Sequence, residues 1–163
     1  MRSAALQASL LVLCLTLASS GSGAETPTAL QPARGDTIPA FDTVGVDGST
    51  QKVEFPKGST TVLLFFLSGC PSCHRMIPEW NRAFERKSPK LRVIGVIMDQ
   101  EPTGFFQTTA VAFPVVRSPG RDFVTKLKIT RAPAALRVTA GGALEDVALG
   151  VVDAIRVGEI FRP

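Results

Sequence analysis

The chain has 163 residues, of which 45% are hydrophobic and 20% charged, and its formal net charge at pH 7 is +4. This length suits one domain with a sizeable core. The positive charge is modest and scattered and the chain has no tyrosine, so it lacks the basic stripe with stacking aromatics that indicates nucleic-acid binding, and we exclude that class.

The first 24 residues have the pattern of a secretory signal peptide. A nearly uncharged start precedes an apolar stretch over residues 4–18, and the small residues 22–24 come before Glu25. The stretch is shorter than the ~20 residues that cross a bilayer comfortably. We therefore predict cleavage after Ala24 and export to the periplasm or another extracytoplasmic compartment. Lipidation at Cys14 and an uncleaved membrane anchor through residues 4–18 are the alternatives.

Removing residues 1–24 leaves two cysteines, Cys70 and Cys73. A disulfide between them would close a loop too short to stabilise the fold by restricting the unfolded chain, so a structural role is the weaker explanation. Residues 25–38 are rich in Pro, Thr and Ala, which predicts a flexible linker. The remaining residues, 39–163, are predicted to form one domain.

Strand and helix patterns alternate along this domain. Asp47-Gly48 and Gly141-Gly142 favour the positive φ of tight turns, which predicts two β-hairpins. The predicted elements are a hairpin over 41–44 and 51–55, a buried strand over 61–67, a helix over 71–87, a second buried strand over 91–98, helices over 103–112 and 121–128, a second hairpin over 134–138 and 144–149, and a helix over 153–161. Because a helix connects the two buried strands, we expect them to pair in parallel.

The sequence Cys70-Pro71-Ser72-Cys73-His74 directly follows the first buried strand and opens the first helix. Two cysteines three residues apart at such a junction make a dithiol suited to electron exchange. The start of a helix favours a thiolate over a thiol, so we expect Cys70, at the N-cap, to be the attacking nucleophile. Cys73, one turn further and less exposed, is expected to resolve the mixed disulfide.

Two other classes of protein are compatible with the same five residues. They also spell the haem-attachment pattern Cys-x-x-Cys-His, in which His74 would be the proximal ligand. Alternatively, both thiolates, with or without His74, could bind and deliver a soft ion such as Cu(I). The preferred interpretation, a redox-active dithiol, needs no cofactor and no metal.

The order of elements, with Cys-x-x-Cys opening the first helix, resembles the thioredoxin fold. Over residues 35–161 the chain is similar to the exported TlpA/ResA-type thiol-disulfide oxidoreductases. The segments that carry this resemblance are Gly35-Asp36-Thr37-Ile38-Pro39-Ala40-Phe41, Asp47-Gly48, Cys70-Pro71-Ser72-Cys73, Pro78, Val93 to Asp99, Phe113-Pro114-Val115-Val116 and Ile129-Thr130-Arg131-Ala132-Pro133. The resemblance implies an α/β, thioredoxin-like fold whose central mixed sheet is flanked by helices, with an N-terminal β-hairpin extension.

The resemblance also implies roles for residues outside the dithiol. Pro133 corresponds to the proline that is cis in this fold and lies opposite the cysteines, and the Ala132 backbone would then pair with an extended substrate. An ordinary trans proline at the start of a strand is the alternative. His74, the only histidine, is expected to face solvent and could bias ionisation at the dithiol. Protein thiols or disulfides are the implied substrates, and an upstream membrane partner is the implied electron donor.

The chain departs from the family at the buried cysteine. Relatives carry an acidic residue either six positions before the first cysteine or three after the second, and here those positions are Leu64 and Met76. The proton relay for Cys73 must therefore use water or another group, or be absent. Ser68-Gly69 replaces the aromatic residue that often precedes the first cysteine. A peroxidase is a further alternative, although Leu63 and Leu67 stand where a peroxiredoxin has Pro and Thr. We expect a reductase rather than an oxidant.

Overall fold

The computed structural model of the protein describes residues 31–163. The predicted signal peptide, Cys14 and the first part of the predicted linker lie outside these residues. Within 31–163, no helix combines the length and the apolar character needed to span a membrane.

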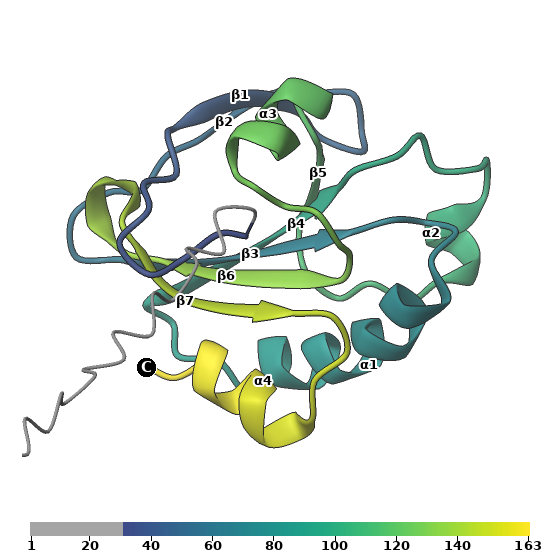
Figure 1. Ribbon diagram of the computed structural model, residues 1–163. Helices are drawn as coiled ribbons and strands as arrows, with labels where there is room; N and C mark the ends of the chain where they lie inside the picture. The colour runs from purple at the N-terminus through teal and green to yellow at the C-terminus, as the bar shows by residue number, and fades with distance from the viewer. Residues whose placement is uncertain (1–30) are drawn as a thin grey trace, which may run out of the picture.

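Five strands form one mixed sheet (Figure 1). In chain order these are β3 (Thr60–Phe66), β4 (Leu91–Ile97), β5 (Val115–Arg117), β6 (Ala134–Val138) and β7 (Leu144–Leu149). Their order across the sheet is β5-β4-β3-β6-β7. β3 pairs in parallel with β4, and β4 with β5, whereas β6 runs antiparallel to both of its neighbours. The predicted parallel pair and the mixed sheet are confirmed.

The sheet is covered on both faces, as Figure 1 shows. The helices are α1 (Pro71–Glu85), α2 (Phe105–Thr108), α3 (Arg121–Lys126) and α4 (Ala154–Ile160). α1 and α4 lie on one side, and α3 lies on the other with the separate hairpin β1 (Phe41–Val44) and β2 (Thr50–Val53). The predicted N-terminal hairpin extension is therefore present, and its Thr43 hydroxyl donates to the Arg117 carbonyl of β5.

The second helix is much shorter than the ten residues 103–112 predicted from sequence. It begins after Gly104, whose positive φ of 88° is not helical, and it ends before Thr109, which is extended. The backbone beyond is held by a side chain of α1, because Asn81 donates to the Ala110 carbonyl at 2.8 Å and accepts from the Ala112 N–H at 2.9 Å. These contacts replace helical hydrogen bonds.

Part of the predicted linker contacts the domain. The Gly35 N–H donates to the Leu144 carbonyl at 2.9 Å, and the Ile38 N–H donates to the Gly142 carbonyl at 2.7 Å. Ile38 is 1% exposed. Gly142 has a φ of +86°, and a Cβ there would lie 2.0 Å from the Ile38 oxygen, so this approach requires glycine. Ordered structure therefore begins before Pro39.

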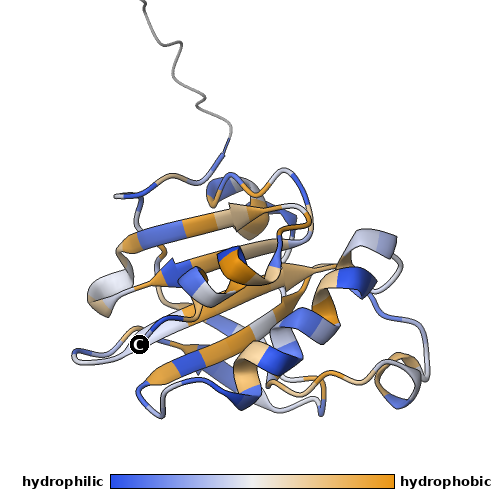
Figure 2. Cartoon of the chain, turned by 90° about the horizontal axis from the view of Figure 1, so that it is seen from below, coloured by the Kyte–Doolittle hydropathy of each residue, from blue (hydrophilic) through white to orange (hydrophobic). Residues whose placement is uncertain are grey.

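The core has two layers, one on each face of the sheet. Successive side chains of β3 alternate between them: Leu64 and Phe66 pack toward α1 and α4, and Leu63 and Phe65 pack toward the hairpin and α3. All four are fully buried, and Figure 2 shows the apolar colour along the central strands. The prediction that the first long strand is covered on both faces is confirmed.

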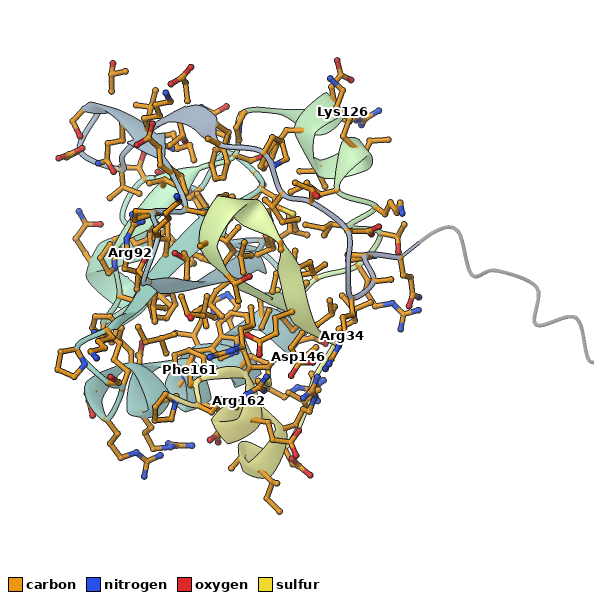
Figure 3. All side chains as sticks on the ribbon, turned by 90° about the vertical axis from the view of Figure 1, so that its left-hand side faces the viewer. Arg34, Arg92, Lys126, Asp146, Phe161 and Arg162 are labelled. Carbon is orange, nitrogen blue, oxygen red and sulfur yellow. The ribbon has the colours of Figure 1, made fainter. Side chains whose placement is uncertain are left out.

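The C-terminal segment is fixed by arginines and carboxylates of β6, β7 and α4. Arg137, only 3% exposed, donates to the Glu145 carboxylate at 2.8 Å. Asp146 accepts from Arg156 at 2.6 Å and from Arg162 at 3.1 Å, and Figure 3 shows Asp146 beside Arg162. The helix that closes the domain is thus tied to the edge of the sheet.

Candidate active site

The dithiol lies where β3 ends and α1 begins. Cys70 is the N-cap of α1, and its Sγ accepts a hydrogen bond from the Cys73 N–H at 3.3 Å. Pro71 occupies the first helical turn, where a missing N–H leaves no bond unmade. Both thiols are free. Cys70 is partly exposed and Cys73 is 0% exposed, which matches the expected difference in exposure between the two cysteines.

Cys73 is held in its protonated form. Burial raises the pKa of the Cys73 thiol to about 12, helped by the neighbouring side chain of Cys70 and by the charges of Cys70 and Asp99. The backbone of Leu67 lowers that pKa and only partly offsets these effects. The two sulfurs are therefore suited to different steps, because one can meet a substrate and the other is shielded.

We expect iodoacetamide to label Cys70 and to spare Cys73 when the reduced, folded protein is treated at pH 7. Because the thiolate is the reactive form and the pKa of Cys73 is about 12, its labelling should rise about tenfold per pH unit between pH 7 and 10. Peptide mass spectrometry measures each site. Labelling in urea is the control, since both cysteines should then react. Equal labelling of the two in the folded protein would contradict this assignment.

The segment before β6 lies beside the dithiol. The Ala132–Pro133 peptide bond is cis, as the resemblance predicted. Ala134, the next residue, pairs with Phe65 near the end of β3, and Ala132 packs against the same apolar layer as Cys70. Within residues 31–163, neither the N–H nor the carbonyl of Ala132 takes part in a hydrogen bond. Its backbone is therefore able to pair with an extended chain.

Ser68 and Asp99 form a contact that the sequence analysis missed. Ser68 is 6% exposed, and its N–H donates to both Asp99 oxygens at 2.9 and 3.1 Å. Its hydroxyl donates to Asp99 Oδ2 at 2.7 Å. Both residues follow the carboxyl ends of neighbouring parallel strands, and that placement was the available signal. Asp99 thereby fixes the turn that leads into Cys70.

His74 also contacts the Ser68 turn. Its Nε2 lies 2.7 Å from the Ser68 carbonyl oxygen, and because a carbonyl can only accept, Nε2 must carry a proton. The ring is exposed and packs edge-on against Phe105, with 6.0 Å between centroids. An effect of His74 on the dithiol stays a prediction.

Asp99→Ala should destabilise the protein and slow disulfide exchange. The substitution leaves the buried N–H and hydroxyl of Ser68 without an acceptor, which costs about 1–3 kcal/mol. Asp99→Asn is the matched control, because its amide oxygen can still accept while the charge is lost. It should restore most of the thermal stability, and it should lower the pKa of Cys73, so that alkylation of Cys73 becomes faster. If Asn and Ala are equally destabilising, the hydrogen bonds are not what fixes the turn.

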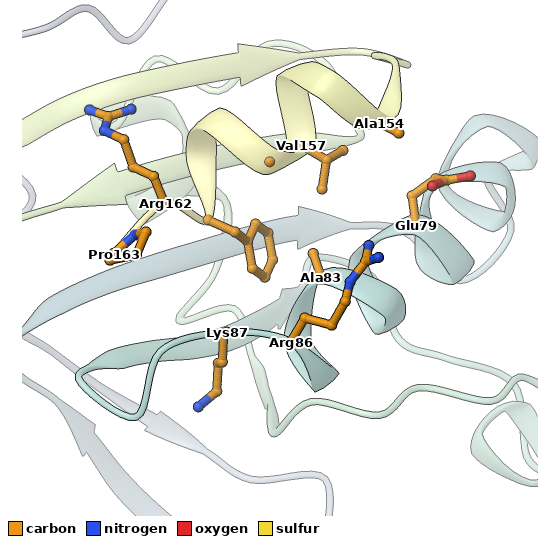
Figure 4. A pocket seen from close by; sticks show the side chains of 10 residues that line it. Glu79, Ala83, Arg86, Lys87, Ala154, Val157, Arg162 and Pro163 are labelled. Atoms are coloured by element: carbon orange, nitrogen blue, oxygen red, sulfur yellow. The ribbon is translucent and has the colours of Figure 1, made fainter.

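The positions that carry an acid in relatives are apolar here. Leu64 and Met76 are at most 1% exposed and lie in the same layer as Cys73. Within residues 31–163, no three His, Cys, Asp or Glu side chains come together as a metal-binding group. A recess of about 270 Å³ between α1 and α4, lined by Ala83 and Val157 among others (Figure 4), contains no residue of the dithiol site.

Residues 33–153 match the family model described as Redoxin. No match was found among curated protein sequences.

Several solved structures share the fold. StoA from Bacillus subtilis is 20% identical, with a TM-score of 0.65, over 77% of this chain and 98% of its own. A thioredoxin-family thiol:disulfide interchange protein from Chlorobium tepidum TLS is 21% identical, with a TM-score of 0.63, over 79% and 97%. The exposed lipoprotein thioredoxin Etrx1 from Streptococcus pneumoniae strain TIGR4 is 19% identical, with a TM-score of 0.65, over 76% and 98%. The predicted thioredoxin-like fold is confirmed.

Proposed function

The chain belongs to the Redoxin family of thiol-disulfide oxidoreductases, and from this premise we propose that it is an exported reductase of protein disulfides that works through Cys70 and Cys73. One observation carries the proposal: a partly exposed cysteine caps a helix, and the second cysteine, one turn further, is fully buried, which raises its pKa. This arrangement gives one sulfur for attack and one for resolution.

The reaction has two exchange steps. The Cys70 thiolate attacks one sulfur of a substrate disulfide, the substrate S–S bond breaks, and one substrate thiolate leaves and takes a proton. Cys73 then loses its proton and attacks Cys70 Sγ, which releases the second substrate thiol and leaves the Cys70–Cys73 disulfide. The substrate gains two electrons and two protons. An upstream dithiol donor at the membrane then reduces the Cys70–Cys73 pair again.

The substrate chain is held beside Cys70 by the Ala132 backbone. An extended segment that pairs with the free N–H and carbonyl of Ala132 would run past the dithiol, next to Pro133. Main-chain pairing of this kind supplies affinity that does not depend on the substrate sequence. Ala132 and Pro133 are therefore substrate-binding residues in this proposal.

Export rests on the N-terminal pattern. Residues 1–24 would be removed after Ala24 or, if uncleaved, would anchor the domain through residues 4–18. The similar Streptococcus pneumoniae protein is an exposed lipoprotein. An extracytoplasmic location supplies disulfide substrates, and it requires electrons to cross the membrane to reach the dithiol.

The haem and metal alternatives have less support. Haem ligation through Nε2 of His74 would require its hydrogen bond to the Ser68 carbonyl to break. A haem would also have to attach beside Cys73, whose side chain is fully buried in the apolar layer. Two-coordinate binding of a soft ion would have to use the Cys73 sulfur, which is 0% exposed, and within residues 31–163 no third His, Cys, Asp or Glu side chain joins the two cysteines as a metal-binding group.

The reduction potential of the Cys70–Cys73 pair tests whether the protein reduces disulfides or introduces them. The protein is equilibrated with glutathione or dithiothreitol redox buffers, and the free thiols are alkylated and counted by mass spectrometry. A value near that of thioredoxin, roughly −270 mV, would support a reductase, and one near −120 mV would indicate an oxidant that introduces disulfides. If no reversible disulfide forms, the proposed chemistry is wrong.

A further inference from the structure

A groove of about 280 Å³ adjoins the dithiol site on the side of the cis proline. It is bounded by Leu67, which precedes the Ser68 turn, and by Ala132, which precedes Pro133. Met98, Val124 and Ile129 supply the rest of its apolar lining. We call it the Ala132 groove. A chain that pairs with the Ala132 backbone and presents a sulfur to Cys70 must place neighbouring side chains in or along it.

Two arginines give this groove a positive rim. Arg121 is the first residue of α3, and Arg131 comes immediately before Ala132, so the two belong to different segments that meet at the groove. Both are exposed. Asp122 follows Arg121 on α3 but does not line the groove.

The rim arginines differ from most of the other arginines in the described part of the chain. Within residues 31–163, neither Arg121 nor Arg131 forms an ion pair with a carboxylate, whereas Arg117, Arg137 and Arg156 each do. Their guanidinium groups are therefore available to a ligand. A guanidinium presents several N–H donors that match the oxygens of a carboxylate.

Two acidic groups on the adjoining surface already have partners. Asp99 accepts three hydrogen bonds from Ser68, and Glu101 pairs with Arg117. These carboxylates lie in a neighbouring recess that shares Met98 with the Ala132 groove. Asp99 keeps its negative charge, because Ser68 is neutral, but it lines the neighbouring recess, whereas the charged side chains that line the Ala132 groove itself are the two arginines.

We propose that the Ala132 groove selects substrate segments in which the reactive half-cystine is flanked by a carboxylate and by an apolar residue. The apolar side chain would pack on Met98, Val124 and Ile129, and the carboxylate would bind Arg121 or Arg131. This inference rests on the proposed function and adds the class of substrate: acidic, extended protein segments. Main-chain pairing at Ala132 sets the position of the substrate segment, and the arginine rim sets the preference for an acidic one.

The test compares two disulfide-bonded peptides of equal length that differ only beside the half-cystine, one with glutamates and one with lysines. The protein is first reduced and freed of reductant, then mixed with each peptide, and the reaction is stopped by acid and alkylation. The second-order rate constant for the acidic peptide should exceed that for the basic peptide by about tenfold at low salt. The ratio should fall as NaCl is raised to about 0.5 M, where charges are screened within a few ångströms.

Charge reversal at the rim should invert this preference. In a variant that combines Arg121→Glu with Arg131→Glu, the basic peptide should react faster than the acidic one. Because the ratio is taken within one variant, a change in dithiol reactivity or in the folded fraction cancels. Lys126→Glu is the matched control: Lys126 lies on α3, outside the groove, and the substitution changes charge by the same amount per residue, yet the ratio should stay at the wild-type value.

The outcomes separate this inference from the proposed function. Hydroxyethyl disulfide, a small neutral substrate, reports on the dithiol alone. If the wild-type protein reduces it and reduces both peptides at equal rates, the groove does not select acidic segments, although the proposed function stands. If neither hydroxyethyl disulfide nor any peptide is reduced, the proposed function itself fails. If Lys126→Glu, which changes the net charge half as much as the double variant, shifts the logarithm of the ratio by half as much, then net charge, and not the groove, sets the preference.

Discussion

Cys70→Ser is expected to reduce disulfide exchange to the uncatalysed background, a loss of more than about 10³-fold, because a serine hydroxyl is not ionised near neutral pH and cannot replace a thiolate as the nucleophile. The fold should survive the change. Cys70 is the N-cap of α1, and serine is among the best residues at that position, so its oxygen can accept the Cys73 N–H in place of the sulfur. Loss of activity would therefore report on chemistry rather than on folding.

The partner variant Cys73→Ser should behave differently. It retains the attacking sulfur and lacks the resolving one, so mixed disulfides between Cys70 and substrates should accumulate. Non-reducing electrophoresis and intact-protein mass spectrometry would detect these species, which dithiothreitol should release. Normal exchange by Cys70→Ser, or trapping through Cys73 instead of Cys70, would show that the two roles are assigned to the wrong sulfurs.

Local sequence signals were sufficient to predict the position of the dithiol and the unequal exposure of its two cysteines. The apolar run that forms β3 and the helix-opening Pro71 place Cys70 at a helix start, and both features lie within ten residues of the cysteine. Helix geometry then puts Cys73 one turn further, facing the core. The unequal exposure of the two sulfurs follows from this local arrangement, so it could be predicted without tertiary information.

Contacts between segments that are distant in the chain could not be predicted from local sequence signals. Asn81 binds the backbone of residues 110–112 and prevents a longer α2, and Ser68 binds Asp99 across 31 residues of chain. Composition suggested a flexible linker up to residue 38, yet the Gly35 and Ile38 backbones pair with the second hairpin. In each case the competing partner is a side chain or carbonyl that periodicity and propensity do not reveal.

The Ala132 groove is also formed by segments that are distant in the chain. Its lining comes from four separate stretches of chain, around Leu67, Met98, Val124 and Ala132, which only the assembled sheet brings together. Arg121 and Arg131 are unremarkable as single surface residues in the sequence. Their significance depends on their common location beside the free backbone of Ala132. A specificity surface of this kind is therefore visible only after the fold is known.

Arg137→Met is expected to lower the thermal stability more than any surface substitution. Arg137 is 3% exposed on β6, and besides Glu145 it donates to the carbonyls of Ile160 at 3.1 Å, Arg162 at 2.7 Å and Pro163 at 3.4 Å. Methionine fills a similar space but donates to none of them. Removing one partner from a buried network leaves polar groups unpaired, which costs about 3 kcal/mol here, since Glu145 keeps its bond to Arg162.

The measurement is the melting temperature by calorimetry or circular dichroism, with an expected decrease of about 10 °C for a domain of this size. Arg92→Met is the matched control, because Arg92 is more exposed and donates to a single carbonyl, that of Glu54 at 2.6 Å, so its loss should cost less than about 1 kcal/mol. Equal decreases for the two variants would show that the Arg137 network does not hold the C-terminal segment. A selective decrease would instead mean that α4, although distant from the dithiol along the chain, is fixed to the sheet mainly through one buried cation. In that case the Cys70 labelling rate of Arg137→Met, measured well below its melting temperature, should stay close to that of the wild type, because Arg137 forms no hydrogen bond with α1 or with the Ser68 turn.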